Sequence, residues 1–342
     1  MNSDRKNSMA LTGVFIFAAF VIIALSSLGV INQYAQSVLM SIGINIIFAA
    51  SLNIVNGYMG EFSCGHAGFM AVGAYAASVI SVILFTENKF TGSPLLPPQS
   101  ALFLFPVVII AGGVAAAFAG LIVAIPSFKT RDDYLAIITL ASNYIITTAI
   151  NNMEIVGASR GFMGMKSTLF AMNSVIPIPW ILVWIIVFAF VSIVLIKRLM
   201  SSALGKGISA IRYDEVAAEI MSVDTNRIKL IAFMFSSGLA GIAGGLFAHQ
   251  LGFINPGSFG IMKSTEGMVM VYLGGMGSLS GSVLSAILFT FLLEILRPLQ
   301  IFKWVIIPLL LILLMQFRPE GLLGNKELGG NLLKRRFLWK NS

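Results

Sequence analysis

Residues 204–230 read LGKGISAIRYDEVAAEIMSVDTNRIKL, and this polar stretch interrupts a chain that is otherwise apolar. It carries eight of the chain's 22 basic and 14 acidic residues. A segment with this many charges cannot lie in hydrocarbon, because no water is there to solvate its charges and polar backbone. We therefore expect it to lie in water, between two membrane-spanning helices.

The middle of this stretch predicts a short helix. Asp214 is a good N-cap, Glu215 suits the first turn, and alanines with Ile220 and Met221 follow. A short helix with apolar residues outside the membrane needs a partner, so we expect a cytoplasmic protein to dock there and to move the membrane helices through it. The alternative is a solvated connection that contacts nothing. The mixed charges, the N-cap and the alternation of Ala and Ile with Glu favour docking.

The composition indicates a polytopic membrane protein. Of the 342 residues, 57% are hydrophobic and 11% charged, and the mean hydropathy is +0.92; soluble domains have about 25% charged residues. The net charge of +8 does not indicate a nucleic-acid partner, because the basic residues neither form one patch nor alternate with exposed aromatics. A single cysteine, Cys64, and two histidines predict no disulfide and no metal site.

Apolar runs of membrane-spanning length recur along the chain. Arg5 and Lys6 precede a run from about Met9 to Val30, which we interpret as a retained span rather than a signal peptide. Further apolar segments lie at about 34–56, 67–85, 101–125, 134–151, 180–199, 228–251, 267–277, 282–296 and 302–317. The pair around Gly277–Gly281 is short, which favours a broken or re-entrant pair. We predict an all-α protein with about 8–10 transmembrane helices.

The basic residues predict the orientation of these spans. The N-terminus, the 126–133 and 197–229 loops and the C-terminal tail together carry 16 of the 22 Lys and Arg residues. The positive-inside rule then makes both termini and the polar stretch cytoplasmic. We expect one transmembrane domain over 1–324, with its cytoplasmic loop at 200–229, and a basic tail over 325–342 that can touch lipid head groups.

Polar residues within apolar segments are candidates for a path through the membrane. They occur in NIVNGYMGEFSCGHAG (53–68) and, every fourth residue, from Thr139 to Asn151. Each group has a structural alternative, since the first can cap two helices at a turn and the second can hydrogen-bond between helices. Glu294 and Arg297 are better explained as a local pair. The candidate path residues are Asn53, Asn56, Ser63, His66, Asn143, Thr147 and Ser278.

Five blocks in order resemble the LivM-type permeases of branched-chain amino acid ABC importers. They are LNIVNGYMGEFSCGHAGFMAVGAYAA (52–77), GASRGFMG (157–164), AIRYDEVAAEIMSVD (210–224), VYLGGMGSLSG (271–281) and FRPEGLLG (317–324). The resemblance extends from about Ile42 to Gly324 and implies the ABC importer permease fold. It also implies that the polar stretch forms a coupling helix, which sits in a groove of an ATPase.

In ABC importers generally, the corresponding loop carries a degenerate E-A-A-x-x-x-G pattern, and the loop of this chain resembles it. Ala217 and Ala218 match its alanines and are expected to face the ATPase, whereas Val216 and Ser222 depart from its Glu and Gly. Glu215 and Glu219 flank the site and can supply the charge. The coupling residues that the resemblance implies are Arg212, Asp214, Glu215, Val216, Ala217, Ala218, Glu219, Met221 and Ser222.

The resemblance implies a permease that moves branched-chain amino acids across a bacterial inner membrane by alternating access. Its implied partners are a second homologous permease, two ATP-binding subunits, an extracytoplasmic solute-binding protein and membrane lipid. This chain is then no enzyme, has no catalytic residue and holds no cofactor. It contains no G-x-x-x-x-G-K-[ST] motif, so ATP and Mg²⁺ would bind the partner subunits.

Two other interpretations stay open. One is a permease of the same type for urea, short-chain amides or another small solute. The other is a stand-alone secondary transporter, which would need charged ion or proton sites within the membrane. Few candidates for such sites exist beyond Glu61, His66 and Glu294.

Overall fold

The computed structural model describes residues 21–86, 92–128, 133–317 and 321–324. Six of its helical segments are long and apolar enough to cross a membrane. They contain α2 (Gln33–Asn53), α3 (His66–Phe85), α4 (Ala101–Ser127), α5 (Asp133–Asn152), α7 (Trp180–Ser201) and α10 (Thr225–Leu251). These segments coincide with six of the predicted spans, which confirms the all-α polytopic class.

The remaining helices are shorter. They are α6 (Met165–Val175), α8 (Ala203–Tyr213), α9 (Glu215–Ile220), α11 (Ile261–Gly274), α12 (Leu279–Ile295) and α13 (Lys303–Phe317). The predicted broken pair is present as α11 and α12, which meet at the turn 275–278. The predicted span at 9–30 lies largely outside the described residues, and the tail 325–342 lies wholly outside them. The number of crossings above six therefore stays a prediction.

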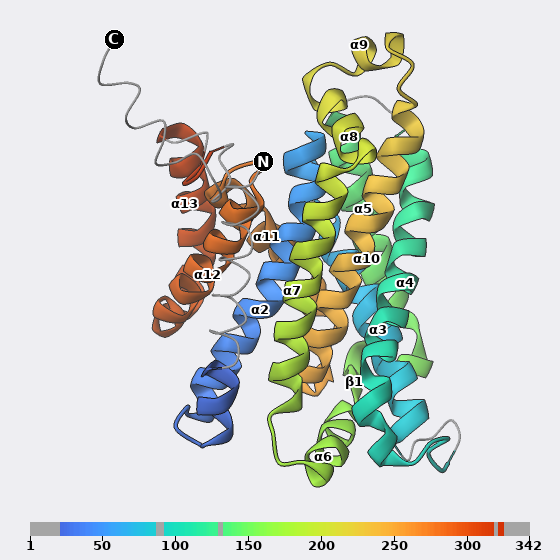
Figure 1. Cartoon of the computed structure of the whole chain (residues 1–342), viewed down its shortest axis with the longest axis vertical. Coiled ribbons are helices and arrows are strands. Elements are labelled where there is room, and N and C mark those ends of the chain that lie inside the picture. The colour runs from blue at the N-terminus through green and yellow to red at the C-terminus, as the bar shows by residue number, and fades with distance from the viewer. Residues whose placement is uncertain (1–20, 87–91, 129–132, 318–320, 325–342) are drawn as a thin grey trace, which may run out of the picture.

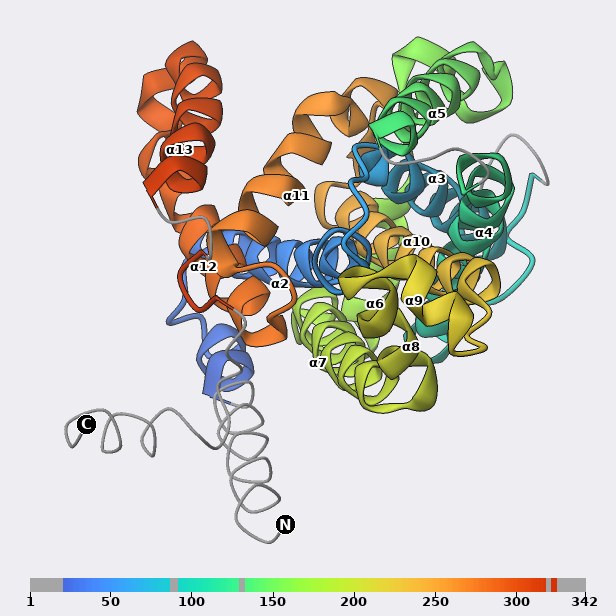
Figure 2. The same cartoon turned by 90° about the horizontal axis from the view of Figure 1, so that it is seen from above.

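Small residues let the central helices pack closely. Gly73 in α3 faces Gly241 in α10, and Gly244 in α10 lies against the carbonyl of Met70. Neither Gly73 nor Gly244 therefore has room for a Cβ atom. Small residues of α10 thus lie against its neighbours, which is how small residues stabilise helix pairs in membranes. In Figure 2, α3, α4 and α10 lie to one side of α2, and α12 and α13 lie to the other.

The two ends of the bundle differ. One end carries α8 and α9, and the opposite end carries α6 (Figure 1). Near α6 the strands β1 (Phe162–Met163) and β2 (Phe253–Ile254) pair antiparallel and join the connection after α5 to the end of α10. The charge distribution predicts that the α8–α9 end is the cytoplasmic one.

The end of α2 nearer the polar loop departs from regular α-helix. It continues into a π-helical segment, η1 (Ile54–Met59), which ends at Gly60 with a φ of 81°. π-Helical turns are rare and are frequently found at functional sites. The non-helical stretch 61–65 follows and leads into α3, and η1 contacts α8 of the polar loop.

Candidate functional site at the polar loop

Capping side chains define each helix of the polar loop (residues 204–230). The Asp214 carboxylate accepts a hydrogen bond of 3.0 Å from the amide of Ala217, which confirms the predicted N-cap. Ser202 caps α8 and Asp224 caps α10 in the same way. Each cap satisfies a backbone donor that the first helical turn leaves free. The loop is therefore a set of short, well-terminated helices rather than an irregular connection.

Ser222 occupies the position where the family pattern has glycine, and its backbone explains that pattern. Its φ is +63°, in the left-handed region. Its amide donates to the carbonyl of Glu219 at 2.9 Å, and the amide of Val223 donates to that of Ala218 at 3.1 Å. These two bonds form a Schellman motif, which favours glycine at its left-handed position. Ser222 thus ends α9 with the required geometry despite carrying a Cβ atom.

This conformation predicts opposite effects for two substitutions. We expect Ser222→Gly to retain import and to leave the thermal stability of the purified protein unchanged or slightly raised. Ser222→Val places a β-branched side chain at positive φ, which costs about 1–2 kcal/mol. It should therefore increase proteolytic cleavage within the loop and reduce import. Equal cleavage of the two variants would contradict the inferred backbone strain.

The water-facing side of the loop tip is apolar. Tyr213, Val216, Ile220 and Met221 are 87, 66, 78 and 79% exposed, respectively. The expectation that both alanines face a partner is wrong for Ala218, which is only 5% exposed, whereas Ala217 is exposed. With only six residues, α9 must pack one face on its own chain, and Ala218 is on that face. We call these four large, exposed apolar side chains the apolar tip.

An ion-pair cluster fastens the loop to the bundle. The Lys229 ammonium of α10 lies 2.7 Å from the carboxylate of Glu61, before α3, and 2.7 Å from that of Glu215 in α9. Glu219 also has an internal partner, since it accepts a 2.7 Å hydrogen bond from Thr225. The two glutamates expected to flank a partner site are therefore held by the chain itself. Lys229 is 6% exposed and links three elements.

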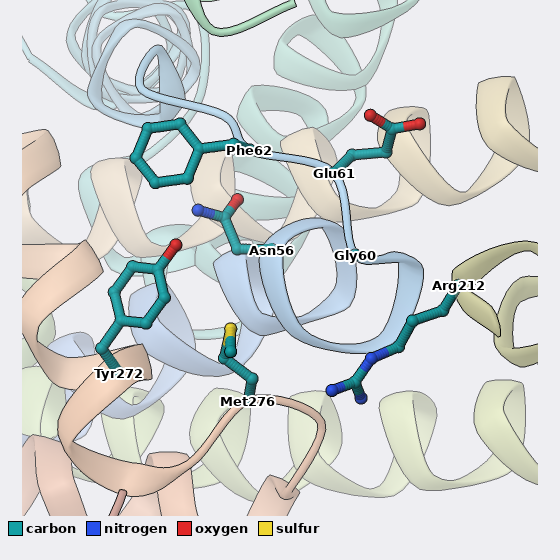
Figure 3. Close-up of a pocket in the computed structure, with 7 residues that line it drawn as sticks. All are labelled: Asn56, Gly60, Glu61, Phe62, Arg212, Tyr272 and Met276. Carbon is teal, nitrogen blue, oxygen red and sulfur yellow. The ribbon is translucent and has the colours of Figure 1, made fainter. Parts of the chain in front are cut away.

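A cavity of about 240 Å³ lies beside this cluster (Figure 3). It brings together Asn56, predicted for the substrate path, and Arg212, predicted for coupling. The Arg212 side chain runs back under η1 toward Met276, whereas the Glu61 carboxylate turns away from it (Figure 3). The lining residues are Asn56, Gly60, Glu61, Phe62, Arg212, Tyr272 and Met276.

Several predicted path residues hold the surrounding turns. Asn53 donates to the carbonyl of Ser278 and accepts from the amide of Gly277, both at 3.0 Å. Ser278 caps α12. The Asn56 amide exchanges hydrogen bonds with the backbone of Ser63, at 3.2 and 3.4 Å. These contacts fix the break between α11 and α12 against η1.

The other predicted path residues lie deeper in the bundle. Buried His66 bonds Ser51 at 2.8 Å, and Thr147 bonds carbonyls of its own helix. Asn143 is buried, and its side-chain oxygen has no hydrogen-bond partner within the described residues. The structure does not gather all seven residues in one place, and only Asn56 lines the cavity. Whether any of them touches cargo stays a prediction.

The cysteine and the terminal ion pair are as the sequence indicates. Cys64 is a free thiol, and burial raises its pKa above the ordinary value. The predicted local pair is confirmed, since Arg297 and Glu294 lie 2.9 Å apart. Among the described residues, no group of three or more His, Cys, Asp or Glu residues could hold a metal ion.

Sequence reasoning missed a second, partly buried ion pair. Lys263 and Glu266 of α11 are 2.8 Å apart, and their side chains are 15 and 12% exposed. The Lys263 ammonium also lies 5.9 and 5.8 Å from the ring centroids of Phe48 and Phe247. The predicted apolar segments at 228–251 and 267–277 had left both residues in the connection between them. The signal was available, because opposite charges three residues apart in a helix can pair.

A bundle of apolar helices with a capped, apolar-tipped loop at one end defines a multi-pass membrane protein of the permease class. The chain belongs to the family described as the branched-chain amino acid transport system / permease component, whose model matches residues 34–315. No solved structure matches the chain.

Named relatives agree with this family. The high-affinity branched-chain amino acid transport system permease protein LivM of Escherichia coli strain K12 is 33% identical over 307 residues, covering 82% of this chain and 68% of the relative. Its counterpart in Salmonella typhimurium strain LT2 is 31% identical over 329 residues, covering 89% and 73%. The permease LivH of E. coli K12 is 24% identical over 303 residues, covering 82% and 91%. The chain is therefore an ABC transporter permease of the LivM type.

Proposed function

We propose that this chain is a transmembrane subunit of an ATP-driven importer that moves branched-chain amino acids into the cell by alternating access. The observation that carries the proposal is the apolar tip, which is large, exposed and presented by a loop with capped helices. Exposed apolar patches of this kind mark interaction sites. The names of the LivM relatives support the cargo class.

The proposed assembly has several subunits. A second homologous permease is supported by the similarity of this chain to both LivM and LivH. Two ATP-binding subunits would hold ATP and Mg²⁺ and would receive the apolar tip. An extracytoplasmic binding protein would deliver the cargo and set most of the selectivity. The chain would lie in the bacterial inner membrane with both termini in the cytoplasm.

The ion-pair cluster gives this coupling a mechanical route. When the ATPase subunits close, the partner would carry α9 with it. Lys229 would pass the displacement on, because it binds Glu215 in α9, lies in α10 itself and also binds Glu61 before α3. A ligand shifts a conformational equilibrium only if its contacts differ between the two states. ATP binding would change the contacts of the apolar tip and of this cluster, and these contacts would then differ between the two states.

Polar residues along the bundle are proposed to accommodate the zwitterionic cargo. Asn56 and Asn143 have side-chain amides between the packed helices, and the Asn143 oxygen has no described partner. A weak path of this kind suffices when the binding protein sets selectivity. The remaining members of the proposed path are Asn53, Ser63, His66, Thr147 and Ser278.

The test is reconstituted transport. We expect the purified complex, with its binding protein, to accumulate labelled leucine in vesicles only when ATP is supplied, and to accumulate no labelled urea. Uptake of urea instead would reassign the cargo. Leucine uptake by this chain alone, driven by an ion gradient, would replace the ABC mechanism with secondary transport. The test with an ion gradient is needed because a secondary transporter requires charged sites among its helices. The partly buried Lys263–Glu266 pair in the described part of the chain is such a site.

A further inference from the structure

The cavity in Figure 3 has the features of a small-molecule site. Its volume of about 240 Å³ is below the range of about 300–1,000 Å³ typical for drug-sized ligands, and suits a metabolite the size of an amino acid. One wall is apolar, from Phe62, Met276 and the ring of Tyr272. The polar groups are few and come from Asn56, the Tyr272 hydroxyl and Arg212.

Arg212 is the charged group that a ligand could neutralise. Its guanidinium has no ion-pair or hydrogen-bond partner within the part of the chain that the structure describes. Two glycines with φ near +80°, Gly60 and Gly277, make room for its side chain, since a Cβ atom at either would press on Arg212. The backbone therefore holds a half-buried cation beneath η1. A guanidinium is suited to bind a planar carboxylate through two parallel hydrogen bonds.

We propose that this cavity binds, from the cytoplasmic side, a small carboxylate that carries a short branched apolar chain. The carboxylate pairs with Arg212, and the apolar chain packs on Phe62 and Met276. Two sources share this chemistry, the transported amino acid and its deaminated 2-oxo acid. Because the Glu61 carboxylate points away toward Lys229, the cavity supplies no obvious partner for an ammonium group. The oxo acid is therefore expected to bind at least as well.

The position of the cavity assigns such a ligand a regulatory effect. The ligand would touch α8 through Arg212, η1 through Asn56, and the α11–α12 region through Tyr272 and Met276. It would thereby hold the polar loop against the membrane helices in the conformation described here. A ligand that binds one state stabilises that state and slows a cycle that must leave it. This inference rests on the proposed function, since it assumes that the loop moves during transport.

The first test measures binding of two probes, leucine and 4-methyl-2-oxopentanoate, to the purified complex without its binding protein. We expect saturable binding of at least one probe and a fall in ATP hydrolysis as that probe saturates. Leucinamide, which lacks the carboxylate, should bind at least tenfold more weakly than the probe that saturates. Absence of saturable binding at millimolar concentration, or equal binding of leucinamide, would overturn the proposal.

Variants locate the site. Arg212→Gln and the cavity-filling Met276→Trp should each weaken probe binding at least tenfold, and inhibition should weaken in parallel when each rate is normalised to its own uninhibited value. Arg227→Gln removes an exposed charge from the same loop, and its affinity for the probes should stay within twofold of the wild-type affinity. Wild-type affinity in both Arg212→Gln and Met276→Trp would refute the site.

The uptake assay separates this inference from the proposed function. If the complex imports leucine with ATP but binds neither probe, only the regulatory site fails. If the probes bind and Arg212→Gln abolishes that binding while no leucine is imported, the cargo assignment fails and the site remains.

Discussion

Replacing Ile220 and Met221 together with aspartate is expected to abolish leucine import while the chain still folds in the membrane. Both side chains face water, at 78 and 79% exposure, so polar replacements should change the free energy of unfolding by no more than about 0.5 kcal/mol. In a docked complex the same positions would be buried in the partner. Burying an unpaired charge costs several kcal/mol, and central apolar residues contribute about 2–4 kcal/mol each to such interfaces.

The loss of ATPase association should therefore exceed about a hundredfold, since each 1.4 kcal/mol is a factor of ten. Co-purification of the ATP-binding subunits with the tagged chain measures this directly. A matched control is the pair Phe170→Asp and Val175→Asp on α6, which is exposed at the opposite end of the bundle. That control should retain the ATP-binding subunits. A double variant of α9 that co-purifies and imports at wild-type levels would show that the apolar tip contacts no partner.

Local rules predicted much of the loop from sequence alone. Asp214 was identifiable as a cap because capping depends on a few consecutive residues, and the structure has that bond. The six long spans were identifiable because hydropathy is a property of one contiguous segment. The orientation of α9 was not predictable in this way. Ala218 is buried because α9 packs on the flanking helices α8 and α10, and a pattern match carries no information about which face does so.

Long-range pairing accounts for the remaining differences. Sequence blocks around Asn56 and Arg212 each suggested a functional residue, but nothing in either block indicates that both line one cavity. The same holds for Glu61 and Lys229, which are in contact although they are far apart in the sequence. Lys263 and Glu266 were left between two predicted spans because hydropathy is a property of one contiguous segment. Hydropathy does not consider that Glu266 can neutralise Lys263 against the packed helices.

Replacing Lys229 with methionine is expected to detach the polar loop from the bundle. The substitution leaves Glu61 and Glu215 without their common cation, and the Lys229 side chain is 8% exposed. Breaking a buried ion pair costs about 3–5 kcal/mol. Because Glu215 is 43% exposed and regains water, we expect a loss near the lower end of that range. Thermal unfolding of the purified complex and proteolysis of the loop would measure it, and import should fall with loop order.

Replacing Glu61 and replacing Glu215 should destabilise the protein unequally if burial sets the cost of losing each ion pair. Glu61 has 19% side-chain exposure and joins α10 to the segment before α3, so Glu61→Gln should destabilise more than Glu215→Gln.

Replacing all three residues with methionine tests whether the charges matter in themselves, because apolar groups of similar size can match a buried ion pair in stability. If the cluster acts as a mechanical link, this triple variant should recover thermal stability and much of the import that Lys229→Met loses. Recovered stability without import would mean that the charges act in the transport cycle itself, and a stable, fully active Lys229→Met would mean that the cluster does not hold the loop.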